Sequence, residues 1–241
     1  FNNLGNVFKD LNDFDEAINS YKKALVIKPD YFEVHYSLGI AFKGLGQLDD
    51  MIKHLKKAVK IQPDLAEVHY RIGVGLEELG RLHEAIKSYQ KVIEINPNFI
   101  EAYNHLGIIF NELGRHDEAI EAYRNALEIN PDISESHNNL GNAFKALGRY
   151  DEAIESYQKA LEINPDYPAL HNNLGSVYKE IGRLDDALKS YKNALIYNPD
   201  YPESYNNLGT TFFELERFNE AFKALKKAIE IEPEYVDAHY N

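Results

Sequence analysis

The sequence contains no cysteine, and its basic residues are outnumbered, with 26 Lys and Arg against 39 Asp and Glu. The missing thiols exclude a disulfide framework, thiolate metal sites and a thiol nucleophile, although they do not fix the cellular compartment. The charge balance makes the chain acidic, with a formal net charge of -13. Because nucleic-acid affinity comes mainly from Lys and Arg that displace counterions, we expect no nucleic-acid partner.

Long apolar segments are also missing. No run approaches the roughly 18 residues that a membrane-spanning helix needs, and the chain does not start with the charged-then-apolar pattern of a signal peptide. We therefore expect no membrane partner and take the cytoplasm as the default compartment. The chain begins at Phe1 and not at Met, so we expect its natural N-terminus to lie upstream. A hydrophobic content of 44% is enough for a sizeable core.

Prolines recur through the whole chain at intervals of 34 residues, without insertion or deletion. They are Pro29, Pro63, Pro97, Pro131, Pro165, Pro199 and Pro233. Glycines keep the same interval, at Gly5, Gly39, Gly73, Gly107, Gly141, Gly175 and Gly209. A period between 20 and 50 residues is typical of a stacked solenoid. We therefore predict one repeat domain that spans residues 1–241.

Each period has the pattern of helix, turn, helix. A capping box, with Asp or Asn followed three residues later by Glu, is predicted to start the first helix. The pairs are Asp30 with Glu33, Asp64 with Glu67, Asn98 with Glu101, Asp132 with Glu135, and Asp200 with Glu203. A glycine that adopts the left-handed conformation is predicted to end this helix, as at Gly148. The second helix is predicted to end before the Asn-Pro or Glu-Pro step.

Small residues mark where the two helices of a pair are expected to cross. Gly141 lies on the first helix, and Ala153 and Ala160 lie on the second, with Tyr157 and Phe144 filling the space beside them. Since each pair buries only part of its apolar surface, stability is expected to come from contacts between neighbouring repeats.

The segment NNLGNAFKALGRYDEAIESYQKALEINPD, residues 138–166, resembles the tetratricopeptide repeat, and the likeness covers essentially the entire chain. The resemblance implies an all-α fold, an α-solenoid in which seven 34-residue helix-turn-helix repeats and the start of an eighth form a right-handed superhelix. Three departures stand out. His or Tyr replaces the family's Trp in most repeats, Met51 and Leu55 replace Ala and Tyr, and Glu216 replaces a turn glycine.

In this family the first helix of each pair makes the concave wall of the superhelix. Side-chain amides on that wall offer a donor and an acceptor together, which suits an extended peptide backbone. The row of asparagines resembles the repeat region of O-linked N-acetylglucosamine transferase, which implies a peptide groove. The predicted groove residues are Asn3, Asn6, Tyr36, Ile40, Tyr70, Arg71, Val74, His105, Ile108, Asn139, Asn142, Asn173 and Asn207.

Two alternatives to this groove remain open. Neighbouring asparagines can bond to one another without any ligand, and the apolar members can pack against the adjacent repeat. The recurring glutamates, such as Glu135, are explained most simply as caps. If they also face the groove, they favour a ligand with some positive charge.

Histidine occupies the family's aromatic position at His35, His69, His137, His171 and His239, and is interpreted as packing. No metal-binding HExxH, phosphate-binding loop or nucleophile elbow is present. We therefore predict a chain without cofactor, metal or catalytic residues.

The favoured function is a non-catalytic scaffold that binds a protein or peptide, as an extended segment or a partner helix, in the concave groove. One alternative is a subunit that stacks end to end into a superhelical fibre, which would place the protein outside the cell. Its contact residues would be Phe1, Asn2, Asn3, His239, Tyr240 and Asn241. Another alternative is the substrate-presenting repeat region of a larger enzyme, such as a glycosyltransferase.

Overall fold

The structure is a computed structural model that describes residues 1–240 apart from the side chain of His239. It divides into two compact units, with unit 1 at Phe1–Ile109 and unit 2 from Phe110 onward, and each unit is described by itself. Unit 1 contains α1 (Asn2–Asp10), α2 (Phe14–Ile27), α3 (Phe32–Gly44), α4 (Leu48–Ile61), α5 (Ala66–Glu78), α6 (Leu82–Ile95) and most of α7 (Ile100–Glu112).

Unit 2 contains the end of α7 and eight further helices. They are α8 (His116–Ile129), α9 (Ser134–Ala146), α10 (Tyr150–Ile163), α11 (Pro168–Glu180), α12 (Leu184–Tyr197), α13 (Pro202–Glu214), α14 (Phe218–Ile231) and α15 (Val236–Tyr240). The described residues contain no strand, which confirms the all-α expectation.

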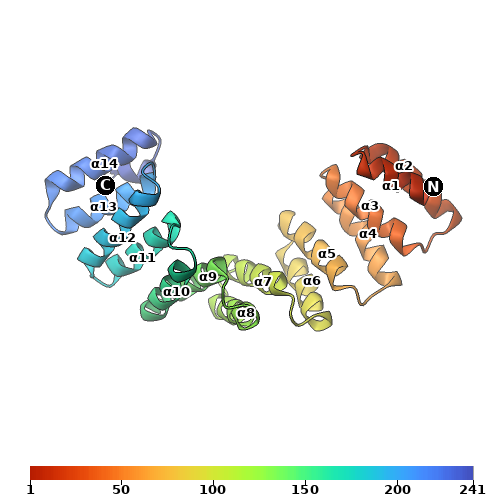
Figure 1. Ribbon diagram of the computed structural model, residues 1–241, viewed down its shortest axis with the longest axis horizontal. Coiled ribbons are helices and arrows are strands. Elements are labelled where there is room, and N and C mark those ends of the chain that lie inside the picture. Colours follow the sequence, from red (N-terminus) through yellow and green to blue (C-terminus); the bar gives the residue numbers. More distant parts are fainter. Residues whose placement is uncertain (241) are drawn as a thin grey trace. The chain divides into compact units, whose positions relative to one another are not determined.

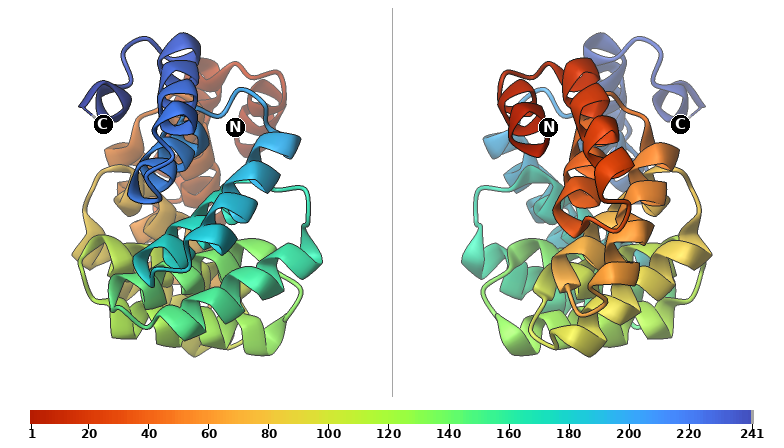
Figure 2. Two further views of the ribbon diagram at one scale, coloured as in Figure 1. Left: turned by 90° about the vertical axis from the view of Figure 1, so that its left-hand side faces the viewer. Right: turned by 90° about the vertical axis from the view of Figure 1, so that its right-hand side faces the viewer.

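Successive helices pair as hairpins. The first helix of each complete pair from α3 onward has 13 residues and the second has 14. Within each unit the two helices of a pair lie side by side, and each pair packs on the next one along the chain (Figure 1). The two side views show the same hairpins (Figure 2). This is the repeated helix-turn-helix solenoid that the 34-residue period predicts.

The turn within each hairpin is closed by a residue with positive φ. Gly46, Gly80, Gly114, Gly148 and Gly182 have φ between 69° and 75°, which confirms the predicted helix ends. Where glycine is missing, Asn12 and Glu216 adopt the same conformation, with φ of 58° and 59°. The turn therefore keeps its geometry in all these repeats, although Glu216 carries the steric cost of a Cβ in this region.

The predicted capping boxes are wrong. Helices α3, α5, α9 and α13 begin two residues after the predicted cap, and their N-cap residues are Tyr31, Leu65, Ile133 and Tyr201, none with a side-chain cap hydrogen bond. Helix α7 also begins two residues after Asn98. The backbone N–H of Asp132 bonds instead to Asn130 Oδ1 at 3.0 Å. The asparagine before Pro97, Pro131 and Pro199 therefore holds the loop, and the following helix starts only after it.

The helices of a pair cross at the predicted small residues. Ala153, Ala160 and Tyr157 are fully buried, and Phe144 is nearly so. A Cβ built at Gly141 would lie 2.7 Å from Tyr157 Cε1, so the glycine makes room for the tyrosine ring. The same glycine-tyrosine contact recurs between Gly175 and Tyr191. Burial of a large aromatic side chain outweighs the roughly 0.5–1 kcal/mol cost of glycine in a helix.

In repeat two, a larger side chain on α4 packs against a smaller residue on α5. Met51, which stands where other repeats have Ala, is 1% exposed, and Leu55 is fully buried. Opposite Met51 lies Gly75 of the next repeat, where other repeats carry Ala or a larger residue. A Cβ at Gly75 would overlap the Met51 Cε methyl. The larger residue on α4 is therefore accommodated by a smaller one on α5.

Candidate functional site

The predicted groove asparagines of unit 2 lie on the first helices α9 and α11 and on α13, and hydrogen bonds join asparagines of neighbouring repeats. Asn173 donates from Nδ2 to Asn138 Oδ1 at 3.0 Å, and Asn207 donates to Asn172 Oδ1 at 3.1 Å. Asn138 in turn donates to Asn139 Oδ1 at 3.3 Å. We call Asn139, Asn142, Asn173 and Asn207 the asparagine row; all four side chains are half-buried.

The two asparagines of each Asn-Asn pair have different roles. Asn172 is 1% exposed, and its Oδ1 also accepts from Ser204 Oγ at 3.0 Å, while its Nδ2 donates to Glu203 Oε1 at 2.8 Å. The bond from Asn207 uses one of the two amide N–H groups and leaves its Oδ1 on a half-buried side chain. Buried Asn172 therefore orients Asn207 of the next repeat.

Asn142 is oriented from behind by a core tyrosine. The Tyr157 hydroxyl donates to Asn142 Oδ1 at 2.6 Å, and burial raises the pKa of Tyr157, which keeps that hydroxyl protonated. In unit 1, Tyr21 makes the same bond to Asn6 Oδ1 at 2.8 Å. Because the oxygen is held by the core, the amide N–H groups of Asn142 and Asn6 are turned away from it.

Two lysines beside the asparagine row were missed by the sequence analysis. Lys145 donates to Ser176 Oγ at 2.7 Å, and Lys179 donates to Thr210 Oγ1 at 2.8 Å and pairs with Glu214 at 3.1 Å. Each bond joins one repeat to the next. Their 34-residue spacing in the sequence was the available signal. The two lysines add positive charge beside the row. The carboxylate of Glu203 accepts a hydrogen bond from Asn172.

Two predicted groove residues of unit 1, Tyr70 and His105, join a hydrogen-bonded chain with Glu77 and Tyr89, which were not predicted. Tyr70 Oη lies 3.1 Å from His105 Nε2, and His105 Nδ1 lies 2.8 Å from Glu77 Oε2. Tyr89 donates to the same Glu77 oxygen at 2.6 Å. Burial alone raises the pKa of Glu77, but the bonds from His105 and Tyr89 outweigh it, so the pKa of Glu77 is lowered and the carboxylate stays charged.

The remaining predicted residues of unit 1 differ in exposure. Arg71 pairs with Glu67 at 2.6 Å, and its guanidinium carbon lies 5.9 Å from the Tyr36 ring centroid. Ile40 and Val74 are half-buried, and Ile108 is 38% exposed. Asn3 is exposed. Ile40, Val74 and Ile108 are therefore neither fully buried nor a continuous exposed stripe.

The histidines at the family's aromatic position do more than pack. His35, His69, His137 and His171 each place Nε2 at 2.8 to 2.9 Å from the carbonyl oxygen of the proline six residues before. The imidazole N–H donates to a carbonyl at the end of the preceding repeat, so these rings fix the loop between repeats. The His and Pro intervals were visible in the sequence, but their contact was not.

The predicted end-to-end residues are only partly described. Phe1 is 58% exposed, Tyr240 is 88% exposed, and Asn2 is half-buried. Asn241 and the side chain of His239 lie outside the described residues. Across the described part of the chain, no group of three or more His, Asp or Glu side chains is arranged to hold a metal ion. None of the described helices is both long and apolar enough to cross a membrane.

Family models match most of the chain. The TPR repeat model matches residues 5–46, 76–114, 107–148, 141–182 and 175–216, and tetratricopeptide repeat models match 32–65 and 202–235. The chain therefore belongs to the tetratricopeptide repeat family. No curated protein matches it.

Solved structures with the same fold include MamA, which is 33% identical, with a TM-score of 0.64, over 67% of this chain and 95% of MamA. YrrB, described as a TPR protein with an unusual peptide-binding site, is 23% identical with a TM-score of 0.65, over 77% of this chain and 96% of its own. The C-terminal part of a TPR protein from Cytophaga hutchinsonii is 16% identical with a TM-score of 0.82, over 98% and 97%.

These comparisons define the class of function. Tetratricopeptide repeat proteins are generally non-catalytic scaffolds that bind protein or peptide partners, and this chain is an interaction scaffold of that class.

Proposed function

We propose that unit 2 binds an extended peptide along the asparagine row, through hydrogen bonds to the peptide backbone. The observation that supports this most directly is the two-layer arrangement of amides, in which buried Asn172 fixes half-buried Asn207 at 3.1 Å. A side chain that is already oriented loses less conformational entropy when a ligand binds. An amide also reads a peptide backbone without regard to its sequence.

The Asn-Asn bonds do not remove this capacity. Each amide has two donors and one acceptor with two lone pairs, and the bond of Asn173 to Asn138 uses one donor. The Tyr157 bond holds the oxygen of Asn142 and leaves its two N–H groups to meet a peptide carbonyl. In unit 1, Tyr36, Ile40, Val74 and Ile108 would contact apolar side chains of a longer partner.

The test starts from a phage-displayed library of random peptides selected on the wild-type chain. The selected peptide is synthesised with a fluorescent label, and its Kd is measured by anisotropy. In the variant Asn139→Ala, Asn173→Ala, Asn207→Ala we expect binding to weaken by about 10- to 100-fold, because each lost hydrogen bond is worth roughly 0.5–1.5 kcal/mol.

The matched control is Asn125→Ala with Asn193→Ala, on the second helices α8 and α12, which should leave the Kd unchanged. An unchanged Kd in the row variant, with its circular dichroism intact, would contradict the groove. The likeness to the repeat region of O-linked N-acetylglucosamine transferase and the end-to-end fibre stay predictions. For the fibre, light scattering that shows a monomer at every concentration is the contrary result.

A further inference from the structure

Helix α4 of unit 1 carries a basic face in an otherwise acidic chain. Lys53, Lys56, Lys57 and Lys60 are all exposed, and their spacing of three, four and seven residues places them on one side of the helix. We call these four side chains the lysine face. Its charge contrasts with the formal net charge of -13 of the whole chain.

Among the second helices that the structure describes, only α4 carries lysine at all four of these positions, although lysine recurs at single positions in other repeats, as at Lys91, Lys159 and Lys227 for Lys57. At the positions of Lys53 and Lys60, helix α8 carries Glu121 and Glu128, and helix α10 carries Glu155 and Glu162. Lys60 is the member particular to α4, since the other second helices have Val26, Glu94, Glu128, Glu162, Ile196 and Glu230 at its position. The charge is therefore reversed at equivalent points of the same scaffold.

Two members of the lysine face are not neutralised by the protein. Lys53 pairs with Asp50 at 3.6 Å and Lys56 pairs with Glu84 at 3.3 Å, whereas Lys57 and Lys60 have no ion pair with any described residue. Burial lowers the pKa of His54, and the nearby charges of His35, Lys57 and Lys53 lower it further. The positive charge of Lys57 therefore acts on the buried ring of His54.

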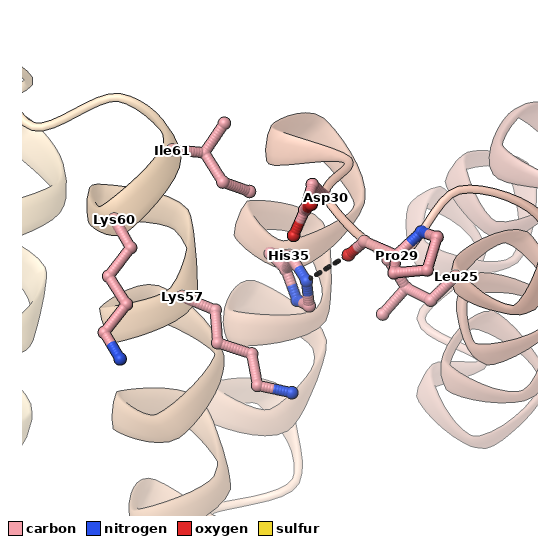
Figure 3. A pocket seen from close by; sticks show the side chains of 7 residues that line it. All are labelled: Leu25, Pro29, Asp30, His35, Lys57, Lys60 and Ile61. Atoms are coloured by element: carbon pink, nitrogen blue, oxygen red, sulfur yellow. Dashed lines mark hydrogen bonds between the residues drawn. The ribbon is translucent and has the colours of Figure 1, made fainter.

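Lys57 and Lys60 line two adjoining hollows. The larger, of about 720 Å³, lies between α2 and α4 and also contacts Leu25, His35 and Ile61. Figure 3 shows Lys57 extending from α4 below His35, whose ring bonds the Pro29 carbonyl. The smaller, of about 380 Å³, contacts Ile52 and Arg81 as well as all four lysines. Ammonium groups thus stand beside apolar walls on both sides.

We propose that the lysine face of α4 binds an acidic peptide segment of a partner protein, with carboxylates at Lys57 and Lys60 and an apolar side chain in the larger hollow. Charge complementarity selects the carboxylates, and Leu25 and Ile61 receive the apolar group. Asp30 and Asp49 also line the hollows and oppose any anion, so the apolar lining of Leu25 and Ile61 is what favours an acidic peptide with apolar side chains over a nucleic acid. This surface is separate from the asparagine row of unit 2.

The test uses a fluorescein-labelled peptide of alternating Glu and Leu, with anisotropy as the readout. Wild-type chain should bind it, with an affinity that falls as salt rises. Lys57→Glu with Lys60→Glu should weaken binding by about 10-fold or more. The control Lys189→Glu with Lys192→Glu on α12 changes the net charge equally and should leave the Kd within about twofold. A polyglutamate peptide without Leu should bind more weakly than the probe.

The proposal is overturned if wild type does not bind the probe, or if the α4 and α12 variants bind it equally. Single-stranded DNA that binds the lysine face more tightly than the peptide would replace the acidic peptide as occupant. Lys57→Gln with Lys60→Gln repeats the test without introducing new negative charge. The asparagine-row variant should bind the probe as wild type does, so failure here and failure of the groove proposal are distinguishable.

Discussion

At the scale of single residues, the buried histidine pair of unit 1 is the main pH-sensitive element. His35 Nε2 donates to Pro29, and His35 Nδ1 lies 3.2 Å from His54 Nδ1. One nitrogen of this contact must carry a proton and the other must not. Because both rings are buried, at 4% and 8% exposure, a second proton in this contact would turn two N–H groups toward each other and place a positive charge away from water.

Acid should therefore destabilise the protein through His54. Burial, and then the neighbouring charge of His35, lowers the pKa of His54 to about 4, whereas an unfolded His titrates near 6.5. Between these values the unfolded chain binds the proton and the folded chain does not, so stability falls as pH falls through this window. We expect a loss of about 2–3 kcal/mol, measured by urea unfolding at several pH values.

The substitution His54→Ser isolates this effect, since Ser stands at the equivalent position in several other repeats. The variant should lose most of the pH dependence between about 6.5 and 4. His83→Ser, at an exposed histidine of α6, is the control and should keep it. The same pH profile in both variants would exclude His54 as the cause.

At the scale of helices, the Met51 and Gly75 contact predicts coupling between α4 and α5. Gly75→Ala should destabilise wild type by about 1 kcal/mol, because overpacking outweighs the gain in helix propensity. In a Met51→Ala background the methyl finds free space, and the same substitution should stabilise by up to about 1 kcal/mol. Urea unfolding of the four proteins gives the coupling energy.

A matched comparison is Gly141→Ala, which meets the Tyr157 ring and should destabilise in either background. If Gly75→Ala changes the free energy of unfolding equally with and without Met51, the coupling energy between the two positions is zero.

The helix ends show how far the sequence could predict this fold. Gly148 was predictable because few other residues adopt positive φ cheaply. The start of α9 was not, because Asp132 and Glu135 fit a capping box in sequence while Asn130 competes for the same backbone N–H in the structure. Local sequence patterns offer both arrangements, and the packing of the following helix decides between them.

The sequence predicted which helices carry the asparagines of the candidate site, but not which of these amides are buried. The helical period places Asn138 and Asn139 next to one another, yet it does not tell which amide of the pair is buried by the following repeat. In the next repeat Asn172 is buried and Asn173 is half-buried. Contacts between repeats, such as Lys145 with Ser176, depend on the rotation from one hairpin to the next, which no single repeat encodes.

At the scale of the whole molecule, helices pack mainly on their neighbours along the chain within each unit, so disturbances should stay local. Ala153→Leu should overpack the crossing of α9 and α10 by roughly 1–3 kcal/mol. Native-state hydrogen exchange should then speed up in α9, α10 and α11, while α3 to α6 of unit 1 keep their protection.

Ala146→Leu, at an exposed position of the same helix α9, serves as the control and should leave exchange unchanged throughout. Equal acceleration of every helix by Ala153→Leu would mean that the chain unfolds as one cooperative body.

Repeat arrays gain and lose modules readily by recombination, because one module can usually replace another. The Met51 methyl limits that freedom here. Deletion of residues 62–95 would preserve the 34-residue interval but bring Ile109 to the place of Gly75, where the Met51 methyl would have to move. The third module is thus a better successor to the second than any other, and this stretch of the gene should resist shuffling more than the rest.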